Sequence, residues 1–132
     1  MTVQRILDTG VVATLSATSG SPQQYLARVD THGSVSAFVI NSDGTNDMSW
    51  KVEGFWRHGN SRDIPDPNVN GETLVEIQAA QAVGTKTASV NALKQVSVSD
   101  AKSYTHVLIS VYKASGDVSN YRVGVYGRID VM

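Results

Sequence analysis

The sequence predicts an all-β fold, an antiparallel and jelly-roll-like β-sandwich of about eight strands. Apolar and polar residues alternate with a period of two in short segments, which is typical of half-buried strands. Clusters of Gly, Asn, Asp, Ser and Pro separate these segments at intervals of about 8 to 12 residues, as in sandwiches. The apolar 41% of the chain is mainly Val, Ala, Leu and Ile, while the helix formers Glu and Lys are scarce.

The length of 132 residues fits one sandwich domain over residues 1–132, large enough to bury roughly two-thirds of the extended chain's surface. Charged residues make up 17% of the chain and nearly cancel, to a net charge of -1. No basic field is therefore present to attract nucleic acid. The chain has no cysteine, which excludes disulfides and thiolate metal sites.

The first ten residues, MTVQRILDTG, have neither the basic region nor the apolar region of a signal peptide. No later apolar run approaches membrane-spanning length. We expect synthesis in the cytoplasm without a signal peptide and no membrane partner. Residues 1–10 are expected to form an N-terminal arm, in which residues 2–8 can form a turn of helix.

Four strands are predicted in the first half of the chain, at residues 11–18, 24–30, 34–41 and 48–58. In the fourth, Trp50, Val52 and Trp56 share one face and are expected in the core. Phe55 falls on the opposite face among charged residues. That face is expected to be covered.

Residues 58–71 form the longest stretch without periodicity, and Pro65 and Pro67 restrict its backbone to extended conformations. Two interpretations stay open. The stretch is either a stiff arm that reaches a partner or a solvated crossover between the sheets.

The predicted strands of the second half span residues 72–78, 85–91, 95–99, 106–114 and 120–131, with 79–84 ambiguous and 101–104 a connector. In the last strand Tyr121, Val123 and Val125 share one face, while Arg122 and Tyr126 share the other. We expect the first of these faces in the core.

No catalytic, cofactor or metal site is predicted, and the chain is not expected to be an enzyme. The three histidines, His32, His58 and His106, lack metal-ligand spacing and are expected in surface or capping roles. Residues 41–47 place oxygen-bearing side chains at alternate positions around Gly44, as in a calcium loop. Val52 stands where an EF-hand needs its bidentate glutamate, so a polar turn is the better interpretation. Phosphate-binding glycine motifs and the nucleophile elbow are absent.

Candidate partner-binding residues are apolar or aromatic side chains on otherwise charged faces, together with the arm at 58–71. They are Phe55, Arg57, Arg62, Ile64, Pro65, Pro67, Val69, Tyr112 and Tyr126.

The closing segments, YTHVLISVYK at 104–113 and NYRVGVYGRI at 120–129, resemble the terminal hairpin of small β-sandwich proteins from tailed-bacteriophage virions. The resemblance is strongest over residues 104–131. It implies a capsid decoration, or cement, protein on the capsid surface of the virion, made in the host cytoplasm. The partners so implied are the major capsid protein and further copies of the chain, with a trimer as the first expectation. A tail or fibre component and a carbohydrate-binding β-sandwich module are the alternatives.

Overall fold

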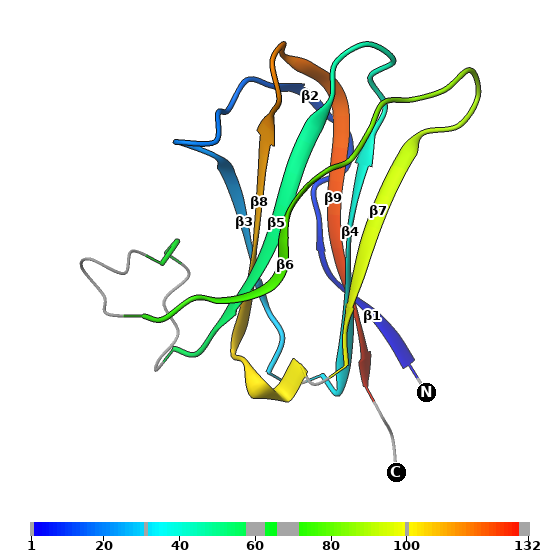
Figure 1. Ribbon diagram of the computed structural model, residues 1–132. Helices are drawn as coiled ribbons and strands as arrows, with labels where there is room; N and C mark the ends of the chain where they lie inside the picture. The colour runs from blue at the N-terminus through cyan, green and yellow to red at the C-terminus, as the bar shows by residue number, and fades with distance from the viewer. Residues whose placement is uncertain (1, 31, 58–62, 66–71, 100, 130–132) are drawn as a thin grey trace.

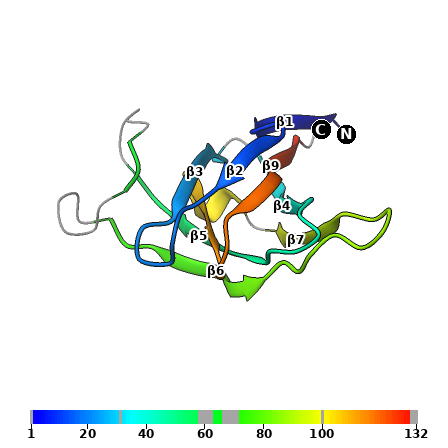
Figure 2. The same cartoon turned by 90° about the horizontal axis from the view of Figure 1, so that it is seen from above.

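The computed structural model describes residues 2–30, 32–57, 63–65, 72–99 and 101–129 (Figure 1). Its strands lie in two sheets that face each other (Figures 1 and 2). The first sheet contains β1 (Thr2–Asp8), β2 (Val12–Leu15), β4 (Ser34–Asn41), β7 (Ala92–Val98) and β9 (Val118–Ile129). The second sheet contains β3 (Gln23–Arg28), β5 (Met48–Phe55), β6 (Val75–Ala82) and β8 (His106–Lys113). The 3-10 turn η1 (Ala101–Ser103) is the one helical element within the described ranges.

The strand order identifies the architecture as a jelly roll. The first sheet runs β1-β9-β4-β7, with β2 also paired to β9, and the second runs β3-β8-β5-β6. Every pair is antiparallel. Apart from the β1–β2 and β5–β6 connections, successive strands alternate between the sheets, as in the double-sheet jelly roll. The predicted all-β sandwich is confirmed.

The core lies between the sheets and follows the predicted alternation. Over residues 35–41 of β4, 48–54 of β5, 107–111 of β8 and 121–127 of β9, every second residue points inward and is almost fully buried. These residues include Val35, Ala37, Val39, Trp50, Val52, Val107, Ile109, Val111, Tyr121, Val123 and Val125. The predicted core face of the last strand, with Tyr121, Val123 and Val125, is confirmed.

Residues 2–8 are neither an arm nor a helical turn but the strand β1, which pairs with β9 from Thr2 opposite Ile129 to Asp8 opposite Gly124. The register shifts between Arg5 and Leu7, so a bulge interrupts the alternation that would mark a strand in the sequence.

The strand predicted at 85–91 is wrong. β6 continues to Ala82 through part of the ambiguous segment, and β7 begins only at Ala92. Between them Val83 still packs into the core, and residues 86–91 form an exposed loop with one isolated bridge, Thr87 to Val90. Val90 is 63% exposed and is not part of the core. Its β-branched side chain favours a strand in the sequence, but no burial supports one there. No helix in the described part of the chain is long and apolar enough to cross a membrane.

Candidate partner-binding surface

Arg57 fixes the segment that follows β5 to the body of the sandwich. Its guanidinium donates from Nε and Nη2 to the two carboxylate oxygens of Glu72, both at 2.9 Å, and from Nη1 to the carbonyl oxygen of Asp63 at 2.8 Å. Its backbone N–H donates to Thr105 Oγ1 at 2.8 Å. The Arg57 and Glu72 side chains are 5% and 13% exposed, so water screens this bidentate pair little. Positions 57, 63 and 72 are thereby held together.

An aromatic stack lies beneath this ion pair. The rings of Phe55 and His106 have centroids 5.2 Å apart and planes 10° apart, and the Arg57 guanidinium carbon lies 5.0 Å from the Phe55 centroid. Nδ1 of His106 lies 2.8 Å from Thr105 Oγ1. Burial, together with the positive charge of Arg57, lowers the pKa of His106, so this imidazole is neutral at pH 7.

The structure corrects the sequence analysis for three of the predicted contact residues. Phe55 is 1% exposed, Arg57 is 7% exposed and Pro65 is also buried, so none offers its side chain to a partner. The outer face of β5 at Phe55 is covered, as expected, but by the chain's own Arg57 and His106.

Two other apolar side chains lie at the surface of the same segment. Trp56 is 56% exposed and Ile64 is 40% exposed. Trp56 was expected in the core, but β5 ends at Phe55, so the alternation that buries Trp50 and Val52 stops before it. We call Trp56, Arg57, Asp63–Pro65 and Glu72 the anchored segment. The candidates Arg62, Pro67 and Val69 lie outside the described residues.

A second apolar area crosses the outer side of the first sheet. The rings of Phe38 and Tyr126 stack with centroids 5.7 Å apart and planes 16° apart. Phe38 lies directly over Gly124, where a Cβ atom would come within 2.3 Å of the Phe38 ring. Ile40 extends this area on β4, and its partner on β7 is Leu93, which is 53% exposed. We call Phe38, Ile40, Leu93 and Tyr126 the aromatic face.

An ion pair fixes one side of the aromatic face. Arg122 donates to both carboxylate oxygens of Asp8, and Tyr126 Oη donates to Asp8 Oδ2 at 3.0 Å. The backbone N–H of Gly10 donates to Asp8 Oδ1 at 2.9 Å. These hydrogen bonds, with that from Arg122 foremost, hold the pKa of Asp8 well below its usual range. The tyrosine and the arginine therefore have fixed positions at the surface.

The predicted contact residues thus fall in three separate places. Phe55, Arg57, Ile64 and Pro65 belong to the region of the anchored segment, and Tyr126 belongs to the aromatic face. Tyr112 lies on β8 opposite Ser49 in the second sheet and is half-buried.

Three residues of the aromatic face, Phe38, Ile40 and Leu93, were not predicted from the sequence. A readable signal existed for two of them, because Phe38 and Ile40 occupy the outward positions of the strand SVSAFVIN.

Residues 41–47 form a polar turn, as predicted. The Asp43 carboxylate accepts hydrogen bonds from the backbone N–H groups of Thr45, Asn46 and Ser119 and from the Ser119 hydroxyl, at 2.8–3.1 Å. These donors, with Asn46 foremost, lower the pKa of Asp43. The carboxylate therefore caps loops rather than facing an open ligand site. The described residues contain no group of three or more His, Cys, Asp or Glu suited to hold a metal ion.

No family model and no curated protein matches the chain. Among solved structures, the chain is similar to the K3 cleaved adhesin domain of Lys-gingipain from Porphyromonas gingivalis W83, with 11% identity and a TM-score of 0.45. The match covers 89% of this chain and 74% of that one.

Proposed function

We propose that the chain is a non-catalytic decoration protein that binds the outer surface of a bacteriophage capsid and stabilises it. The single observation that carries the proposal is the anchored segment, where a buried bidentate ion pair holds a stretch that presents Trp56 and Ile64 to solvent. Tryptophan is among the residues that contribute most at protein interfaces, and a segment held in place loses little conformational entropy on binding.

The aromatic face supplies a second contact area on the first sheet. In this proposal one area contacts the major capsid protein and the other contacts further copies of the chain, with a trimer as the expected cluster. Such contacts exist only on the assembled shell, so their binding free energy stabilises the shell by mass action. At a free concentration of 100 times the Kd this amounts to about 2.7 kcal/mol per site.

The test uses particles assembled without this protein. Wild-type protein is added, bound protein is measured by co-sedimentation, and the temperature of genome release is recorded. We expect binding to raise that temperature and Trp56→Ala to weaken binding about tenfold or more, as for an interface hot spot. The matched control is Val90→Ala, an equally exposed apolar residue of the β6–β7 loop. Equal binding by both variants would refute the role of the anchored segment, and no binding to the particle would refute the function.

Carbohydrate binding is the second candidate, favoured by the Phe38–Tyr126 ring pair beside the fixed Arg122. A sugar ring stacks on aromatic faces and takes hydrogen bonds from neighbouring polar groups. In a glycan-array measurement this function predicts saturable binding that Tyr126→Ala removes and Tyr126→Phe largely keeps, because phenylalanine retains the ring.

A further inference from the structure

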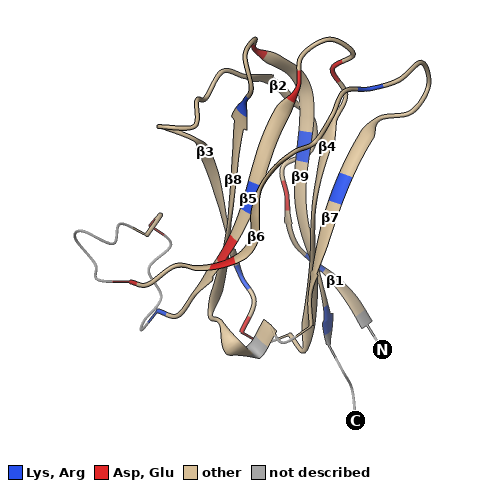
Figure 3. Ribbon diagram, viewed as in Figure 1, with Lys and Arg blue, Asp and Glu red and all other residues tan. Residues whose placement is uncertain are grey.

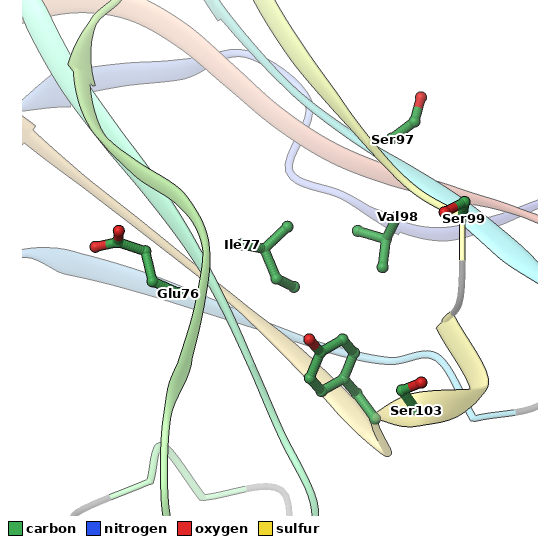
Figure 4. Close-up of a pocket in the computed structure, with 7 residues that line it drawn as sticks. Glu76, Ile77, Ser97, Val98, Ser99 and Ser103 are labelled. Atoms are coloured by element: carbon green, nitrogen blue, oxygen red, sulfur yellow. The ribbon is translucent and has the colours of Figure 1, made fainter.

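The sandwich is open on the side where β6 and β7 form the edges of the two sheets. A cleft of about 300 Å³ lies there. Figure 4 shows the side chains of Ile77 on β6 and Val98 on β7 pointing toward each other across it, while Glu76 and Ser97 point away. The facing side chains of Ile77 and Val98 give the cleft an apolar pair, while the polar residues Glu76, Ser97, Ser99 and Ser103 also line it.

Tyr104 lines the same cleft, after η1. Its ring packs directly on Gly54 of β5, where a Cβ atom would lie 2.7 Å from Tyr104 Cδ1. The absence of a side chain at Gly54 lets the tyrosine sit close to the second sheet. The cleft is thus a recess of mixed lining at the strand edge, in which Ile77, Val98 and the Tyr104 ring supply the apolar contacts.

The two edges differ in their regularity. β7 pairs with β4 through seven consecutive residue pairs, from Val98 opposite Val35 to Ala92 opposite Asn41, and no described strand lies on its other side. β6 pairs with β5 with two register shifts. A regular edge presents a row of backbone donors and acceptors that another strand can join, whereas bulges discourage such pairing.

Lys94 determines which strand suits this edge. Its partner on β4 is the fully buried Val39, so Lys94 stands on the inner side of β7 together with Val98. It is exposed and gives the blue band on β7 in Figure 3. A charge at an inner edge position opposes pairing with an apolar strand, and an opposite charge directly across from it removes that penalty.

We propose that β7 receives an extended peptide strand with an acidic residue opposite Lys94 and an apolar residue four positions away, opposite Val98. Residues four apart in a strand point to the same side, so the apolar side chain enters the cleft when the acidic one meets Lys94. Main-chain hydrogen bonds supply affinity and the recess supplies specificity, as in other strand additions. The inference rests on the proposed function for the source of the strand, an extended segment of the protein that the chain decorates.

The test selects ligands from a displayed library of random nine-residue peptides, with the full chain as bait. We expect enrichment of an acidic and an apolar residue four positions apart. A synthetic peptide from the selection should protect backbone amides of β7 from hydrogen exchange. Its affinity should fall at least tenfold for Lys94→Glu and stay unchanged for Lys86→Glu, a charge-matched control at an exposed lysine of the β6–β7 loop.

Three results would overturn the inference: no enriched pattern, binding insensitive to Lys94→Glu, or hydrogen exchange that shows the edge amides of β7 already protected in the chain without peptide. None of these decides whether the chain binds capsids, because the co-sedimentation assay measures that separately. Undiminished capsid binding by Lys94→Glu would refute strand addition on the particle while leaving decoration intact.

Discussion

Replacing Arg57 by alanine leaves the Glu72 carboxylate in place without its cation. Removing one partner of a buried ion pair costs about 3–5 kcal/mol, because the other charge stays uncompensated away from water. The Glu72 side chain is 13% exposed, so some hydration remains and the lower end of this range applies. The substitution also removes the hydrogen bond to the Asp63 carbonyl and the contact with the Phe55 ring. We expect the free energy of unfolding to fall by about 3 kcal/mol.

Urea denaturation measures this loss, and a thermal scan should show a Tm lower by about 10 °C for a domain of this size. The matched control is Arg28→Ala, which breaks the exposed pair with Asp30, where the arginine side chain is 54% exposed. Such a pair contributes at most about 1 kcal/mol. The double variant Arg57→Met with Glu72→Leu should recover most of the loss, because it leaves no buried charge. A loss for Arg57→Ala no larger than for Arg28→Ala would refute the reasoning.

Three further predictions follow from other sites. Gly54→Ala should lower the free energy of unfolding by about 1–3 kcal/mol, since the new methyl group would overlap the Tyr104 ring, whereas Gly20→Ala, which meets open space, should change little in the same urea titration. Asp43→Ala should lower the free energy of unfolding by about 2–4 kcal/mol, because the hydrogen bonds that its carboxylate accepts from the loops are lost. Added calcium should leave the wild-type Tm unchanged, and a calcium-dependent rise would contradict the interpretation of residues 41–47 as a polar turn. Folding lowers the pKa of His106, so the stabilisation by its neutral imidazole is complete above a pH of about 6.5 and is lost as the pH falls through the folded pKa. His106→Gln should therefore flatten the dependence of the free energy of unfolding on pH in this range. An unchanged slope would contradict the lowered pKa of His106.

The strands at 34–41 and 106–113 could be predicted from the sequence, because every second side chain of each packs into the core between the sheets. The residues at which strands end could not be predicted from the sequence. Phe55 and Trp56 are adjacent, and which one is buried depends on where β5 stops and on Arg57 folding over Phe55. That contact joins residues distant in sequence, since Arg57 is held by Glu72 and Thr105.

The candidate site was only partly predictable for the same reason. An apolar residue on a polar face, such as Phe55 or Tyr126, marks a covered or contacting position. The sequence does not reveal whether the cover comes from the chain itself or from a partner. Phe55 is covered internally, whereas Tyr126 is half-buried and stacks on Phe38 at the outer side of the first sheet.

The strand β9 receives β1 and β2 on one side and β4 on the other. The three earlier strands therefore have no common neighbour until residues 118–129 have been synthesised, and among the described strands β1 and β2 have no other pairing partner. Loop closure over nearly the whole chain must precede the gain from burial, so folding is expected to be slow and completed in one late cooperative step. A ribosome-bound chain that stops before Val118 would expose those strands to aggregation.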